Sequence, residues 1–179
     1  MDKKITDFFD LLNRRTIEAI ESSDIKESCT ATLLLLCAAV DSLSKLTCDD
    51  NQYAAFLNHR GNKVRFQHFL QDVMGGDYGR LKDQLYDLRN DIVHTGINTQ
   101  VVLSKHQNDQ HLEEVDGYLW VNTGRFVDDL KQIIQRIKED IEANGPYHQN
   151  ATKRLAELSI IEVNQDAMPS PGPDDSLFQ

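Results

Sequence analysis

The side chains best suited to chemistry in this sequence lie close together, in the stretch YDLRNDIVHTG from Tyr86 to Gly96. His94 can exchange a proton near neutral pH, and the Arg89 guanidinium can neutralise phosphate oxygens with a fixed fork of donors. Asn90 can orient the imidazole or a ligand. Metal-free RNA cleavage needs such groups, because a ribose 2′-hydroxyl attacks the neighbouring phosphate and negative charge develops on the phosphate oxygens.

The chain around this stretch has the apolar periodicity of an amphipathic helix that runs from about residue 78 to Thr95-Gly96. On such a helix Asn90 and His94 are four residues apart and share one face, whereas Arg89 lies about 140° away from His94. Arg89 can therefore join the other two only by reaching round the helix or by acting across a dimer. The apolar stripe consists of Leu81, Leu85, Leu88 and Ile92.

A purely structural interpretation of the same residues is also open. Arg89 can form an ion pair with Asp87 or Asp91 on its own helix, and surface pairs of this kind are common. His94 can cap the end of the helix, where the helix dipole favours a cation. The residues alone leave both interpretations standing.

Helical spacing of apolar residues also predicts the elements that position this stretch. The segment from about 26 to 46 is apolar nearly all round, which favours a place in the middle of a bundle or in a subunit interface. Thr123 is predicted to cap the last long helix, and Gly145-Pro146 to stop it. The other helices are expected over about 6–22, 52–57, 63–74 and 151–159.

The pattern changes in residues 111–122, HLEEVDGYLWVN, where Asp116-Gly117 is a strong two-residue turn signal for a β-hairpin. Residues 163–179 are acidic and contain three prolines, which is typical of disorder. The fold class expected is therefore all-α: an antiparallel helical bundle over residues 1–162 with a small β-hairpin insertion, followed by a disordered tail.

The formal net charge of −10 opposes non-specific binding to polyanions, because such binding depends on cations that release counterions. A site that engages one or two phosphates locally is still compatible with this charge. The nearest basic cluster in sequence is Arg60, Lys63 and Arg65, which can either guide RNA or form the solvated face of its helix.

Metal and cofactor signatures are missing from the sequence. The three cysteines match neither a zinc nor a CxxC spacing, the histidines show no HxxxH or HExxH pattern, and no phosphate-binding glycine loop occurs. We therefore expect no metal and no cofactor. Neither a signal peptide nor an apolar run of about 20 residues is visible, so the expectation is a cytoplasmic protein with no membrane partner.

The stretch LYDLRNDIVHTG, preceded by an apolar helix that ends AAVDSLSKL, resembles the HEPN superfamily (higher eukaryotes and prokaryotes nucleotide-binding). The hallmark of that family is an Arg followed by a polar residue, with a His after four to six intervening positions. Arg89, Asn90 and His94 match it with four intervening residues, on a late helix of a helical bundle. The resemblance covers about residues 5–143.

This resemblance implies a metal-independent endoribonuclease of a bacterial toxin or defence system, which leaves 2′,3′-cyclic phosphate ends on its RNA substrate. It implies that His94 is the general acid/base, that Arg89 stabilises the phosphorane-like charge and that Asn90 orients. It also implies a homodimer in which both motifs converge, so that the Arg89 of one subunit serves the His94 of the other. An antitoxin or a defence-complex partner would then be expected.

Two other functions stay open for a protein with this resemblance. Some members of the family are non-catalytic modules that recruit protein or RNA, such as accessory or immunity components, and the net charge of −10 is compatible with that role. Transfer of a nucleotide to a protein target is a third possibility, but the chain has no glycine loop to support it.

Overall fold

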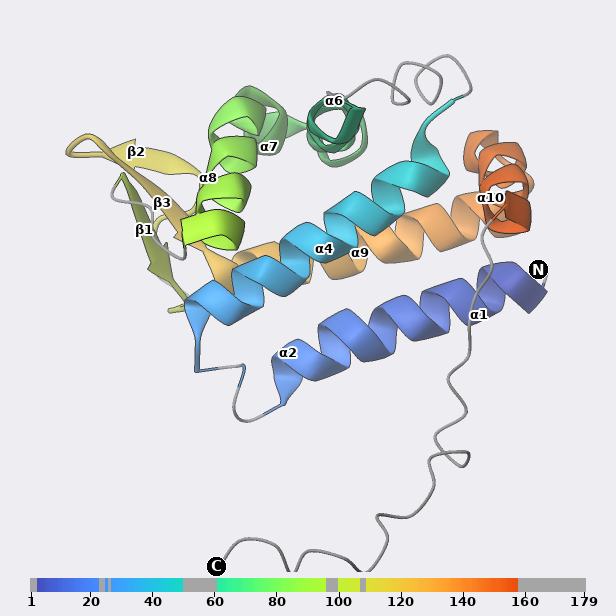
Figure 1. The fold of residues 1–179 in the computed structure, drawn as a ribbon, viewed down its shortest axis with the longest axis horizontal. Coiled ribbons are helices and arrows are strands. Elements are labelled where there is room, and N and C mark those ends of the chain that lie inside the picture. Colours follow the sequence, from blue (N-terminus) through green and yellow to red (C-terminus); the bar gives the residue numbers. More distant parts are fainter. Residues whose placement is uncertain are drawn as a thin grey trace, which may run out of the picture.

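The protein is mainly helical, with a small three-stranded sheet at one end (Figure 1). The computed structural model describes residues 3–22, 25, 27–49, 61–95, 100–106 and 109–157. The predicted mainly helical class is confirmed. The helices are α1 (Lys3–Leu12), the π-helical η1 (Asn13–Glu18), α2 (Ala19–Glu21), α4 (Cys29–Thr47), α6 (Gly61–His68), the π-helical η2 (Phe69–Met74), α7 (Gly76–Arg80), α8 (Lys82–Thr95), α9 (Thr123–Glu142) and α10 (Pro146–Glu157).

Helix α4 is the central element, in contact with the N-terminal helices and with α6, α8, α9 and α10. Its Leu36, Val40 and Leu43 side chains are 0% exposed, as expected for a helix that is apolar nearly all round. The helix starts where Ser28 Oγ accepts the backbone N–H of Ala31, an N-cap. By length and composition α4 could also cross a membrane, but half of it is buried within the protein, as core helices commonly are.

The N-terminal helix runs alongside α4 as one rod, but its middle third is a π-helix (Figure 1). Leu12 and Ile17 are five residues apart, and both are buried. In an α-helix that spacing would turn them about 140° apart, whereas the i→i+5 hydrogen bonds of a π-turn bring them back to nearly one face. The π-turn therefore keeps the apolar stripe of the predicted helix directed at the core.

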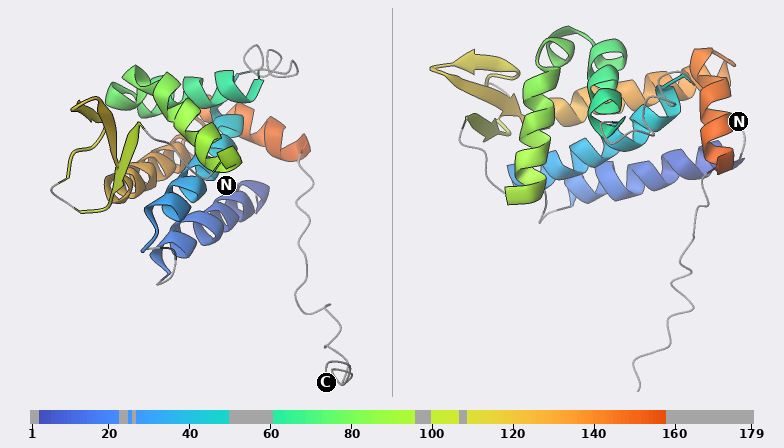
Figure 2. Two further views of the ribbon diagram at one scale, coloured as in Figure 1. Left: turned by 60° about the vertical axis from the view of Figure 1, so that its left-hand side comes forward. Right: turned by 45° about the horizontal axis from the view of Figure 1, so that its top comes forward.

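The predicted end of the helix expected over 63–74 is confirmed, since η2 ends at Met74 and Gly75 adopts a φ of 71°, which glycine tolerates without strain. The predicted single helix after it is divided at Leu81, which has φ −103° and ψ 15°. Leu81 is 1% exposed and fills the core at this corner. The result is the short α7, followed by α8. Helices α6 and α8 both cross over α4 (Figure 2).

The predicted β-hairpin is confirmed as strands β2 (Glu113–Val115) and β3 (Tyr118–Asn122), which pair antiparallel. The turn residues Asp116 and Gly117 both have positive φ, 53° and 79°, as a type I′ turn requires. A third strand that was not predicted, β1 (Val101–Ser104), pairs parallel to β3, with Val101 opposite Leu119. The strand order is β1-β3-β2.

Helix α9, the predicted last long helix, begins at Thr123, but its N-cap is Asn122 and not the predicted Thr123. Asn122 Oδ1, not Thr123, accepts the backbone N–H of Arg125 at 3.1 Å. Thr123 Oγ1 instead donates to the Ser104 carbonyl oxygen and ties α9 to β1. Pro146 does not merely stop a helix, because it is the first residue of α10, where its missing N–H costs nothing.

Three predicted features lie outside the described residues: the short helix over 52–57, the domain boundary at 162 and the acidic tail over 163–179.

Candidate functional site

Helix α8 places the predicted site residues because its apolar stripe is buried. Leu85, Leu88 and Ile92 are 3%, 1% and 6% exposed and face the core. The positions between them are therefore directed outward. Arg89 and Asn90 are half-buried on α8, and His94 is exposed in its last turn.

The Arg89 guanidinium is held at two points. Its Nη2 donates to Asp41 Oδ2 on α4 at 2.9 Å, and its Nη1 donates to Asn90 Oδ1 at 2.9 Å. Its carbon Cζ lies 6.0 Å from the centre of the Tyr86 ring. The side chains of Arg89 and Asp41 are 21% and 22% exposed, so the pair is better shielded than an ordinary surface ion pair.

The structural alternative, an ion pair of Arg89 with Asp87 or Asp91, is wrong in its partner, since the carboxylate comes from Asp41 on another helix. The sequence does carry a signal for Asp41. It is the only charged residue between Glu27 and Lys45, in an otherwise apolar stretch. A lone carboxylate in a core helix is an indication that a buried cation lies opposite.

The structure brings Arg89 and Asn90 together but leaves His94 apart. Within the described residues, no hydrogen bond or ion pair joins His94 to either of them. Asn90 and His94 are four residues apart on α8, as predicted, but the observed side-chain partner of Asn90 is Arg89. One subunit alone does not assemble the predicted triad.

The Cys37 thiol lies one helical turn before Asp41 and senses the same charges. Complete burial raises its pKa to about 12, the Asp41 carboxylate raises it as well, and the Arg89 guanidinium lowers it. The thiol therefore stays protonated at neutral pH and is not an activated nucleophile.

The predicted basic cluster divides into different environments, and Arg60 lies outside the described residues. Lys63 is 44% exposed, with its Nζ 3.9 Å from Asp87 Oδ1 and 5.4 Å from the centre of the Tyr86 ring. Lys63 and Arg89 thus both lie beside the Tyr86 ring, within the range of a cation–π contact.

Arg65, by contrast, is only 8% exposed. Its Nε donates to Ser44 Oγ at 3.1 Å and its Nη2 donates to Asn62 Oδ1 at 2.8 Å. This guanidinium packs α6 onto α4 and offers little surface to RNA.

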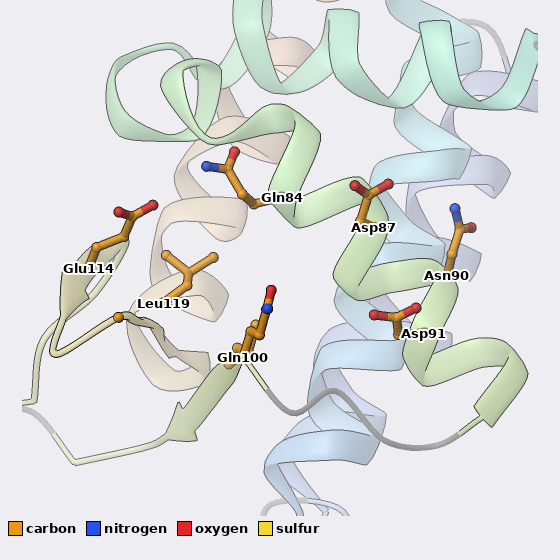
Figure 3. Close-up of a pocket in the computed structure, with 9 residues that line it drawn as sticks. Gln84, Asp87, Asn90, Asp91, Gln100, Glu114 and Leu119 are labelled. Atoms are coloured by element: carbon orange, nitrogen blue, oxygen red, sulfur yellow. The ribbon is translucent and has the colours of Figure 1, made fainter.

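A groove of about 600 Å³ lies on the other side of α8, between that helix and the sheet (Figure 3). Asp87, Asn90 and Asp91 of α8 all contribute to its lining (Figure 3). With Glu114 the described lining holds three carboxylates and no basic side chain, so the groove repels phosphate.

Among the described residues, no group of three His, Cys, Asp or Glu side chains is arranged to hold a metal ion. No protein-family model matches the chain. Searches of curated proteins and of solved structures also returned no significant match.

Proposed function

We propose that this protein is a HEPN-like, metal-independent endoribonuclease of a bacterial toxin or defence system, acting in the cytoplasm as a homodimer. The observation that supports it best is the Arg89 side chain. It is held towards α4 by Asp41, remains partly exposed and lies beside Tyr86 and Lys63. This combination of a fixed guanidinium, an aromatic ring and a second cation suits RNA.

A second copy supplies what one subunit lacks. Arg89 and His94 are about 140° apart on α8, so the complete site needs the Arg89 of one subunit and the His94 of the other. On α4, before the Asp41 that holds Arg89, Leu34 and Leu35 are half-buried and Ala38 is exposed, and Val93 on α8 is 49% exposed. We assign the dimer contact to this apolar strip, the α4–α8 face.

In the proposed reaction, one His94 imidazole accepts the proton of a ribose 2′-hydroxyl, whose oxygen attacks the adjacent phosphorus. The bond from phosphorus to the 5′-oxygen breaks, and a protonated His94 donates a proton to that leaving oxygen. Arg89 stabilises the charge that builds up on the non-bridging oxygens, and Asn90 holds the guanidinium in place. The products are a 2′,3′-cyclic phosphate and a 5′-hydroxyl.

The test is RNA cleavage in EDTA by the wild type and by the variants His94→Ala and Arg89→Ala. Wild type is expected to give 2′,3′-cyclic phosphate ends, and each variant is expected to be at least 100-fold slower. His106→Ala, which removes an exposed imidazole outside the proposed site, serves as the matched control. Equal cleavage by wild type and His94→Ala would falsify the proposal.

A second candidate function is a non-catalytic HEPN-like interaction module, such as an accessory or immunity component. The groove between α8 and the sheet supports it, because a described lining with three carboxylates and no basic side chain suits a basic protein segment better than RNA. Cyclic-phosphate products that are lost in Arg89→Ala would rule this candidate out.

A further inference from the structure

A carboxylate at position 41 is expected to lower the free energy of unfolding. Its Oδ2 accepts from Arg89, but its Oδ1 is buried and has no hydrogen-bond partner among the described residues. A buried oxygen without a donor costs about 1–3 kcal/mol, and more when the group is charged. An apolar side chain would suit this core helix better, since replacing buried ion pairs by apolar groups is often neutral or stabilising. Stability alone therefore does not account for Asp41.

Asp41 affects the direction in which the Arg89 side chain extends from α8. Without it, the long Arg89 side chain has two other carboxylates within its own helix, Asp87 and Asp91, and both line the groove on the side of the sheet. Asp41 instead holds the guanidinium against α4. Two of the five guanidinium N–H donors are used by Asp41 and Asn90, so three remain for a ligand.

We propose that Asp41 is a positioning residue for Arg89: it keeps the guanidinium on the α4–α8 face, against α4 and apart from the Asp87 and Asp91 carboxylates of its own helix. This inference rests on the proposed ribonuclease function, because it concerns the group that stabilises the transition state. Asp41 does not itself touch the RNA. Its loss therefore lowers kcat more than it changes KM, since a freely rotating Arg89 binds RNA but stabilises the transition state less well.

The experiment compares steady-state RNA cleavage by wild type, Asp41→Asn, Arg89→Ala and the double variant. We expect Asp41→Asn to lower kcat by about 10- to 100-fold with KM changed by less than about threefold. In the Arg89→Ala background the same change is expected to have no further effect on kcat, because the residue that it positions is gone. Glu114→Gln removes one carboxylate from the groove and is the charge-matched control, with kcat expected to equal that of wild type.

A second measurement separates positioning from folding. Rotation of the Arg89 guanidinium, followed by NMR of its nitrogen-bound protons, is expected to be hindered in wild type and fast in Asp41→Asn. If Asp41→Asn fails to fold, Asp41→Glu keeps the charge but displaces the guanidinium by one methylene, and it is expected to show the same selective loss of kcat.

The possible outcomes distinguish this inference from the proposed function. Cleavage by wild type and by Asp41→Asn at the same rate would overturn the positioning role and leave the ribonuclease standing. Faster cleavage by Asp41→Asn would also overturn it, because the ion pair would then restrain Arg89 in an inactive position. Additive losses in the double variant would assign Asp41 a role independent of Arg89. No cleavage by wild type would overturn both proposals.

Discussion

The backbone N–H of Asn122 donates to Nδ1 of His111 at 3.1 Å, which places the proton of the neutral imidazole on Nε2. That nitrogen lies 2.9 Å from Tyr78 Oη, and the Tyr78 hydroxyl donates to Asp129 Oδ2 at 2.9 Å. The chain of hydrogen bonds joins α7, the segment before β2 and α9. Burial raises the pKa of Tyr78, as does Asp129, so the hydroxyl remains a donor throughout the neutral range.

The hydrogen bonds that join Asn122, His111, Tyr78 and Asp129 predict that the protein is less stable in mild acid. Burial lowers the pKa of His111 below its usual 6.5, with Arg125 acting in the same direction and Asp129 and Asp77 opposing. Below about pH 6.5 the unfolded chain therefore binds more protons at this residue than the folded protein does. The contribution of His111 to the unfolding free energy is complete above that pH and falls as the pH drops towards the folded pKa.

Urea unfolding between pH 7.5 and 5 checks this pH dependence. His111→Gln is expected to be less stable at pH 7.5 but to lose less stability on acidification than wild type. The matched control is His94→Gln, which removes an exposed imidazole and should retain the wild-type acid sensitivity. Identical pH dependence in wild type and His111→Gln would contradict the assignment.

The cap of α9 predicts a local loss of stability. Asn122→Ala removes the acceptor of the Arg125 N–H and the donor to the His106 carbonyl oxygen, so it should cost about 1–2 kcal/mol in urea unfolding. Asn122→Ser keeps an acceptor for the cap without burying a charge and loses the second bond, so its cost should be smaller. Equal losses in both variants would show that the bond to His106, and not the cap, carries the effect.

The assignment of the dimer contact predicts that a charge on the α4–α8 face separates the subunits. Light scattering of wild type should give about twice the chain mass of 20.4 kDa. Ala38→Glu is expected to give the mass of one chain and to lose RNA cleavage, because a buried unpaired charge is strongly unfavourable. Ala156→Glu introduces the same charge at an exposed position of α10 and should leave both properties as in wild type. A dimeric, active Ala38→Glu would place the subunit contact elsewhere.

Substitutions of Lys63 and Arg65 on α6 should have different effects on RNA binding and stability. Lys63→Ala is expected to weaken RNA binding with unchanged stability and to reduce the salt slope of log K by about 0.7, as one lost contact to a single-stranded phosphate does. Arg65→Ala should instead lower the unfolding free energy by about 1–3 kcal/mol, because it leaves Ser44 and Asn62 without their partner. Lys153→Ala on α10 is the control for non-specific charge effects. A stable Arg65→Ala with a reduced salt slope would reverse these roles.

Much of the fold was predictable because local chemistry decides it. The Asp116-Gly117 turn determines the hairpin, and the glycines at 75 and 76 end a helix, because each needs a backbone conformation that few residues adopt. Strand β1 was not predictable in the same way. Its run Val101-Val102-Leu103 has no alternation, and it forms only because β3 offers a parallel edge that lies distant in sequence.

Only those features of the site that lie within the single helix α8 were predictable from the sequence. The motif from Arg89 to His94 lies where helix periodicity places it, half outward on α8. The partner of Arg89 was not evident, because Asp41 is 48 residues earlier and meets it only through the crossing of α8 over α4. The burial of Arg65 was hidden for the same reason, since Ser44 on α4 determines which way that guanidinium turns.

The parallel pairing of β1 with β3 also affects the order in which the strands are expected to form during folding. The β2–β3 hairpin closes through a two-residue turn, so it can form within microseconds once the chain collapses. Strand β1 must wait for it, because the register of Val101 with Leu119 closes a loop around the finished hairpin. The groove between α8 and the sheet, which needs β1 as one wall, is therefore expected to be among the last surfaces to take shape during folding.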